Sequence, residues 1–141
     1  MRVEVTKVDQ SENHGSYVFF DCPVGKCYAK WRGTRQPELR GYSVEIDINQ
    51  KMSKSNVVSS LPDSDKRLLI EKGDVFMFGE LEGMDDDSMG YLRIHDSCII
   101  MVECELPYPE VGEKVRMTLR PKDFEVTPIK KNGDGRIKQF L

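Results

Sequence analysis

Long apolar runs are missing from this sequence. The longest uncharged apolar stretch, Ser97–Val102, has six residues, whereas a helix that crosses a bilayer needs about 20. The opening residues, MRVEVTKVDQ, also lack the apolar core and the small-residue cleavage site of a secretory signal. We therefore expect a cytoplasmic protein with no membrane partner, in which the four cysteines are reduced thiols.

Residues that commonly carry catalysis are scarce. The chain has two histidines, His14 and His95, and both lie in predicted turns. His95, Asp96 and Ser97 are the residue types of a catalytic triad, but neighbouring residues of a strand point to opposite faces. The sequence contains no G-x-S-x-G motif, phosphate-binding glycine loop or metal-ligating histidine pair. We therefore predict that the protein is not an enzyme and uses no cofactor.

The cysteine spacing does not fit a structural zinc site. Cys22 and Cys27 flank a Pro-Gly turn, but such a site needs two closely spaced pairs. Cys98 and Cys104 lie on one predicted strand and, at roughly 3.3 Å per residue, stand about 20 Å apart. We therefore expect no metal, and cysteines that are small buried side chains.

Residues 51–55 read KMSKS, letter for letter the loop of class I aminoacyl-tRNA synthetases whose lysines hold ATP phosphates. In that family the loop follows a nucleotide-binding α/β domain and has a partner HIGH motif. Here the nearest fragment of that motif is His14-Gly15, and no alternation of strands and helices predicts a parallel sheet. We therefore predict a solvated, flexible loop.

The overall charge excludes a strongly basic nucleic-acid binder. The net charge is -3 and the pI about 5.5, with 38% hydrophobic and 32% charged residues. This composition predicts a globular protein that suits a basic partner, and it confines any nucleic-acid site to a local patch. At 141 residues we expect one β-rich domain, residues 1–129, followed by a basic, mobile tail, residues 130–141.

Period-two alternation of apolar and polar residues predicts strands along most of the chain. We expect Cys98–Cys104 to be a central strand, because Ile99 and Met101 add apolar residues to its second face, and Pro128 to put the last strand at an edge or end. Residues 49–62 are predicted as a long loop and residues 63–72 as a helix that Gly73 ends. The predicted strands are 2–8, 17–21, 28–32, 42–48, 75–81, 91–94, 98–104, 115–119 and 124–129.

These elements predict a mainly β fold: a single small antiparallel β-barrel or sandwich with one short helix and a C-terminal hairpin. The order of a meander, a helix and further strands resembles that of the oligonucleotide/oligosaccharide-binding (OB) barrels over residues 1–105. The resemblance lies in the element order and carries over no functional residue.

An acidic cluster is the first candidate site. Its carboxylates are adjacent and so do not match the alternate spacing of a calcium loop. They form either a solvated hairpin tip or a surface for a basic protein partner. The chain resembles bacterial immunity proteins in being short, mildly acidic and without catalytic residues, which implies a non-enzymatic inhibitor that captures a toxin. The cluster consists of Glu80, Glu82, Asp85, Asp86 and Asp87.

A basic-aromatic cluster is the alternative site. On a barrel face, its aromatic rings would stack bases while its cations follow phosphates, which predicts an OB-like domain that binds single-stranded nucleic acid. The competing interpretation is that the only tryptophan anchors the core. The sequence leaves the oligomeric state open. The cluster consists of Tyr28, Lys30, Trp31, Arg32 and Arg35.

Overall fold

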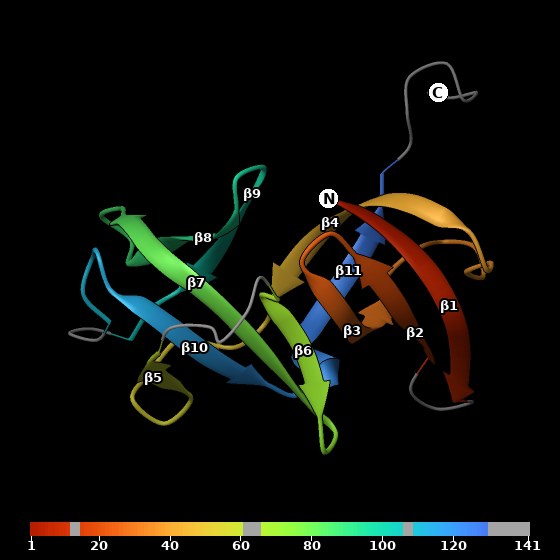
Figure 1. Cartoon of the computed structure of the whole chain (residues 1–141), viewed down its shortest axis with the longest axis horizontal. Helices are drawn as coiled ribbons and strands as arrows, with labels where there is room; N and C mark the ends of the chain where they lie inside the picture. Colours follow the sequence, from red (N-terminus) through yellow and green to blue (C-terminus); the bar gives the residue numbers. More distant parts are fainter. Residues whose placement is uncertain (12–14, 61–65, 106–108, 130–141) are drawn as a thin grey trace.

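The computed structural model describes residues 1–11, 15–60, 66–105 and 109–129, and this part of the chain is mainly β, as predicted (Figure 1). No helix within it is long and apolar enough to cross a membrane. The predicted tail and His14 lie outside the described residues. The strands are β1 Arg2–Ser11, β2 Gly15–Cys22, β3 Gly25–Trp31, β4 Gly41–Ile48, β5 Val57–Ser59, β6 Leu68–Glu71, β7 Asp74–Met84, β8 Met89–His95, β9 Cys98–Glu103, β10 Lys114–Leu119 and β11 Phe124–Pro128.

Five strands close into a barrel. β1 pairs with β2 and β4, and β2 pairs with β3. β11 completes the ring by pairing antiparallel with β4 and parallel with β3. The alternation within β2 decides which side chains fill this barrel: Val18 and Phe20 are buried, while Tyr17 and Phe19 point outward and are half-buried. We call β1, β2, β3, β4 and β11 the N-terminal barrel.

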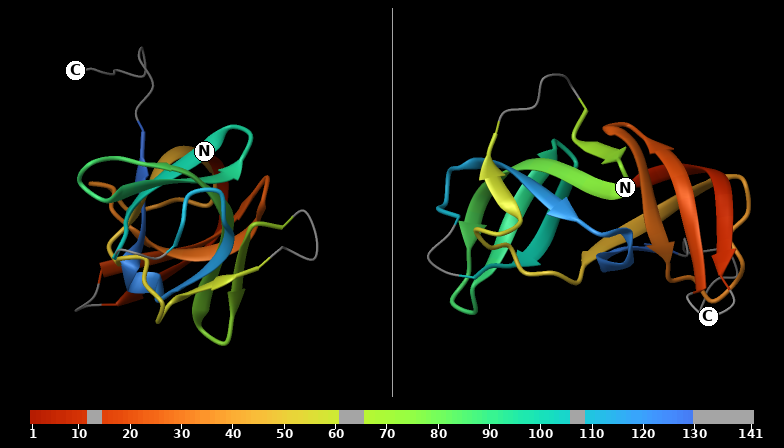
Figure 2. Two further views of the ribbon diagram at one scale, coloured as in Figure 1. Left: turned by 90° about the vertical axis from the view of Figure 1, so that its left-hand side faces the viewer. Right: turned by 90° about the horizontal axis from the view of Figure 1, so that it is seen from below.

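The remaining strands, β5 to β10, form a second unit inserted between β4 and β11, which we call the inserted lobe. β7 is its centre and pairs with β6, β8 and β10, while β8 and β10 pair in turn with β9 and β5. Figure 2 (right) shows the two units side by side. One cluster of buried side chains runs through both, from Phe20 to Met77 and Met117. The single-domain boundary at residue 129 stays a prediction.

The two units are joined where β3 meets β6. Gly25 pairs with Leu68 there, and the backbone N–H groups of Arg67 and Leu68 both donate to the carbonyl of Val24, at 2.6 and 3.1 Å. A Cβ on Gly25 would lie 2.1 Å from the carbonyl oxygen of Leu68, and its φ is +144°. Both observations mean that only glycine fits at this junction.

The predicted helix over residues 63–72 is wrong where the structure describes it. Residues 61–65, with the expected helix cap, lie outside the described part, and Leu68–Glu71 is strand β6. Leu68 faces the core and Leu69 pairs with Phe76 of β7 on the other face. Lys72 and Gly73 both have positive φ, so the expected helix stop is a two-residue hairpin turn. The helical element among the described residues is the 3-10 turn Pro121–Asp123.

Three other strand predictions are also corrected. β9 is not central: it pairs with β8, and Ile99 and Met101 are 43% and 53% exposed. β11 is not at an edge, because it pairs with both β3 and β4 and closes the barrel, but it does end at Pro128, which was the other predicted alternative. β10 and β11 form no C-terminal hairpin with each other, since β10 pairs in the inserted lobe and β11 in the barrel.

The KMSKS segment is structural rather than a freely solvated loop. Met52 is fully buried, and its backbone exchanges hydrogen bonds with Glu103 and Glu105, which joins this segment to the end of β9. Asn56 fixes the turn that follows, accepting from the N–H of Ser53 at 2.9 Å and donating to the carbonyl of Lys51 at 2.8 Å. Strand β5 then occupies part of the predicted long loop.

Candidate functional site

Three aromatic rings gather on the outer face of the N-terminal barrel. Tyr17 and Phe19 are outward residues of β2, and Tyr28 is the outward residue of β3 between them. The Tyr17 and Tyr28 rings stack with centroids 5.3 Å apart and an interplanar angle of 15°, and the Phe19 centroid lies 4.2 Å from that of Tyr28. All three side chains are half-buried, so one side of the cluster is open to solvent. We call them the aromatic face.

Polar groups border the aromatic face. The ammonium of Lys7 lies 5.4 Å from the Phe19 centroid and 3.9 Å from the carboxylate of Asp9. The Tyr28 hydroxyl donates to Asp9 at 3.2 Å. Burial, followed by this hydrogen bond and the charge of Asp9, raises the pKa of Tyr28 to about 12. Tyr28 is therefore a neutral ring at physiological pH, held in place by its own hydroxyl. Lys30, which pairs with Tyr17 across the strands, adds a second cation.

The predicted basic-aromatic cluster is divided between the core and the surface. Trp31 is 8% exposed, its indole N–H donates to the carbonyl of Arg35 at 2.8 Å, and its ring meets Tyr42 edge-on at 4.9 Å. Trp31 therefore anchors the core, as the competing interpretation held. Arg32 is exposed and lies 3.8 Å from the carboxylate of Glu125. Arg35 is exposed and holds Trp31 through its backbone.

Sequence reasoning thus identified Tyr28 and Lys30 on this face but missed Tyr17, Phe19 and Lys7. A signal was present, because residues 17–21 are apolar on both faces of a strand. In a small closed barrel only one face of each strand can point inward, so the second apolar set had to be at the surface or under another unit.

The predicted acidic cluster is largely engaged in intramolecular contacts. Glu82 pairs with Arg93 through two contacts, at 3.1 and 3.2 Å, and this hydrogen bonding raises the pKa of the guanidinium. Asp85 accepts from the backbone N–H groups of Asp87 and Met89, at 2.9 and 3.0 Å, and so builds the turn between β7 and β8.

The other carboxylates of the cluster differ in setting. Glu80 is half-buried and lies across the strands from Arg93 on β8 and from Lys114 on β10. Asp86 and Asp87 are exposed at the tip of the turn. The five residues therefore do not form one uniform acidic surface, and only two of them present their charge at an exposed tip.

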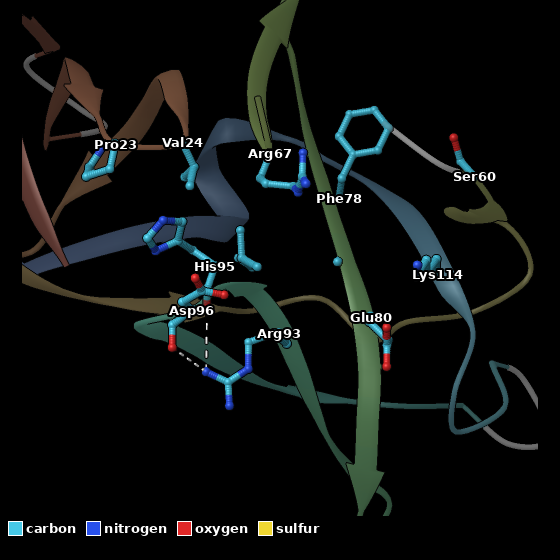
Figure 3. Close-up of a pocket in the computed structure, with 12 residues that line it drawn as sticks. Pro23, Val24, Ser60, Arg67, Phe78, Glu80, Arg93, His95, Asp96 and Lys114 are labelled. Carbon is cyan, nitrogen blue, oxygen red and sulfur yellow. Dashed lines mark hydrogen bonds between the residues drawn. The ribbon is translucent and has the colours of Figure 1, made fainter. Parts of the chain in front are cut away.

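A cavity of about 560 Å³ opens where the β2–β3 turn meets the inserted lobe (Figure 3). His95 and Asp96 reach it from the end of β8, and Phe78 from β7. The His95 Nδ1 lies 3.1 Å from the hydroxyl of Ser97, but within the described residues no hydrogen bond joins the ring to a carboxylate. The lining is polar and of mixed charge: Pro23, Val24, Ser60, Arg67, Phe78, Gly79, Glu80, Arg93, Ile94, His95, Asp96 and Lys114.

The four cysteines all lie within the described residues and are free thiols, Cys27 and Cys104 buried and Cys22 and Cys98 half-buried. Burial raises the pKa of each, that of Cys27 to about 12. Among the residues that the structure describes, no three histidine, cysteine or carboxylate side chains come together as a metal site. Burial and the raised pKa values favour protonated thiols of low reactivity.

No protein-family model, curated protein or solved structure matches the chain.

Proposed function

We propose that the protein binds single-stranded nucleic acid on the aromatic face. The observation that carries the proposal is the contact of Tyr17, Tyr28 and Phe19 with one another on the outer surface of β2 and β3. Stacking between bases and aromatic rings contributes about 1–3 kcal/mol per base and tolerates any sequence. A half-open set of neutral rings beside Lys7 and Lys30 is suited to that role.

The architecture supports the same proposal. The N-terminal barrel is a closed ring of five strands, compatible with the OB-like resemblance in the sequence. OB barrels bind oligonucleotides and oligosaccharides on the face of their second and third strands. Here the aromatic face lies on the second and third strands of the barrel.

The charges around the face set the expected strength of binding. Lys7, Lys26 and Lys30 are outward residues of β1 and β3, but Asp9 and Asp21 are outward residues of β1 and β2. With a net charge of -3, the protein gains little from long-range attraction to phosphates. We therefore expect binding that depends on stacking and has a shallow dependence on salt.

The competing proposal is a cytoplasmic, immunity-type binding protein that captures a basic partner with the acidic cluster. The exposure of Asp86 and Asp87 at the β7–β8 turn favours it. Such a tip would accelerate encounter with a basic protein. The engagement of Glu82 with Arg93 and of Asp85 with backbone N–H groups leaves less free charge than the sequence suggested, and we therefore rank it second.

Fluorescence anisotropy with labelled single-stranded DNA and RNA tests the first proposal. Tyr28→Leu should weaken binding about tenfold by removing the central ring of the face. Tyr91→Leu is the matched control, because Tyr91 is a half-buried strand tyrosine of β8, outside the face. Absence of oligonucleotide binding by the wild type, or equal binding by the two variants, would refute it. Retention of a basic protein that Asp86→Asn with Asp87→Asn releases would favour the competing proposal.

A further inference from the structure

The strand pairing makes the outer face of the N-terminal barrel continuous with one face of the inserted lobe. The strands β1, β2, β3, β6, β7 and β10 are consecutive in one sheet. At the junction Gly25 pairs with the core residue Leu68, and Leu68 pairs in turn with Met77, so the inward sets of the two units are in phase. Because side chains alternate along a strand, the outward sets are in phase as well. Tyr28 and Phe76 therefore belong to the same face of one twisted sheet.

That face carries further aromatic and cationic side chains on the inserted lobe. Phe76 and Phe78 are outward, half-buried residues of β7. Arg116 of β10 pairs with Phe78 across the strands, and its guanidinium carbon lies 5.1 Å from the Phe76 centroid. Figure 1 shows β6 between β3 of the barrel and β7 of the inserted lobe. The combination of rings and cations found at the aromatic face is thus repeated on the inserted lobe, beyond the junction.

Arg116 has the properties of a phosphate ligand. A guanidinium that stacks on a ring uses its flat face, while its edge donors remain available for an anion. The Nε of Arg116 is covered by protein and has no hydrogen-bond acceptor within the described part of the chain, so the donors that can meet an anion are those of the two terminal nitrogens. Its opposite strand position is Phe78 rather than a carboxylate, so this cation is not neutralised across the pair. Lys114, by contrast, lies opposite Glu80.

We propose that one single strand of nucleic acid runs across both units, from the aromatic face over the β3–β6 junction to Phe78 and Arg116. This inference rests on the proposed function and extends its site. From β2 to β10 the track crosses five strands, which at a spacing of about 4.8 Å gives it a length of about 19 Å. The cavity at the junction lies along this path, because it is lined both by Val24 of the β2–β3 turn and by Phe78 (Figure 3).

Three carboxylates of the acidic cluster limit where the strand can run. A fourth, Glu80, lines the junction cavity itself, where it lies across the strands from Arg93 and Lys114. Asp85 follows Phe78 by seven residues along β7 and its turn, which is about 23 Å at roughly 3.3 Å per residue. The track therefore crosses β7 near its first half, away from Asp85, Asp86 and Asp87, whose charges would repel phosphates. The acidic tip in this arrangement keeps the strand off the far end of the lobe.

Anisotropy titrations with fluorescently labelled homopolymers of increasing length, about 4 to 24 nucleotides of single-stranded DNA or RNA, test the extension. Wild-type affinity should rise beyond the length that the barrel alone accommodates. Phe78→Leu and Arg116→Gln should each lower long-oligonucleotide affinity about tenfold and leave the shortest oligonucleotides unaffected. Arg116→Gln should also reduce the salt slope by about 0.7. The matched control is Arg40→Gln, which removes a guanidinium stacked 3.9 Å from the Tyr42 ring elsewhere.

The outcomes separate the two proposals. If the wild type binds no oligonucleotide of any length, the proposed function itself fails. If it binds but both variants match the wild type at every length, or lose affinity equally at all lengths, the extension is wrong and the aromatic face stands. Thermal unfolding of each variant identifies any folding defect. If the variants are folded, Arg116→Lys, which keeps the charge, should have the wild-type salt slope that Arg116→Gln lacks.

Discussion

The indole N–H of Trp31 donates to the backbone carbonyl of Arg35 at 2.8 Å, so the only tryptophan is fixed by the loop that follows its own strand. Gly33 lies between them, and a Cβ there would stand 2.5 Å from the indole nitrogen. The pair fastens the 32–40 loop to the barrel wall. The indole N–H of Trp31 thereby has its hydrogen-bond acceptor inside the protein and is not available to a ligand.

Trp31→Phe should therefore change stability rather than ligand binding. The substitution removes a buried hydrogen bond and part of a packed ring, and we expect a loss of about 1–3 kcal/mol in the free energy of unfolding. Urea denaturation measures the loss, and oligonucleotide titration should give the wild-type affinity. Tyr28→Leu should have the reverse profile, with weaker binding and a smaller stability change. If folded Trp31→Phe lost much of its affinity for oligonucleotides, Trp31 would belong to the binding site after all.

Gly25→Ala should be far more damaging than Gly73→Ala. Both glycines have positive φ, but a Cβ at Gly25 meets the Leu68 carbonyl at 2.1 Å, while one at Gly73 has no neighbour within 4 Å. We expect a cost of about 1 kcal/mol at Gly73 from backbone strain alone, and of about 2–5 kcal/mol at Gly25, where a steric clash is added. Equal unfolding free energies for the two variants, measured by denaturation, would contradict the tight junction between β3 and β6.

The strands of this fold could be predicted from sequence because their inward residues alternate. Tyr42 and Val44 of β4 and Val115, Met117 and Leu119 of β10 are buried, as the pattern required. Pairing partners could not be predicted, since alternation indicates which face is buried but not which strand lies alongside.

The wrong predictions have the same origin, because they too depend on which strands pair. The residues of β6 have an ambiguous short pattern, and pairing with β7 decides it. Ile99 and Met101 have the composition of a covered face, yet both are exposed. The aromatic face was not predicted for a related reason: its rings come from two strands and meet only when β2 and β3 pair in register.

Alkaline pH should destabilise the protein through its buried thiols. Burial raises the pKa of Cys27 from 9.0 to about 12, so the folded state keeps this proton at pH values where the unfolded chain has lost it. The stabilising contribution is complete below pH 9 and falls by about 1.4 kcal/mol per pH unit above it, up to the folded pKa. Cys27→Ala should have a shallower decline in unfolding free energy between pH 9 and 11. An unchanged slope would show that Cys27 is not buried as described.

Asp85→Ala should destabilise the β7–β8 turn, whereas neutralising its neighbours should not. Asp85 accepts from two backbone N–H groups and lies 3.5 Å from the Tyr91 hydroxyl, so alanine leaves these donors without their acceptor. We expect a loss of about 1–2 kcal/mol in unfolding free energy. Asp85→Asn, which keeps an acceptor oxygen, should recover part of it.

Asp86→Asn with Asp87→Asn is the contrasting variant, because both side chains are exposed and the substitution keeps their shape. Its unfolding free energy should stay within about 0.5 kcal/mol of the wild type. Since two negative charges are lost, oligonucleotide binding should be unchanged or slightly stronger if the strand avoids the tip. Weaker oligonucleotide binding by this variant would place the tip in the track and contradict the path over Phe78 and Arg116. Loss of a basic protein partner would instead identify the tip as the binding surface.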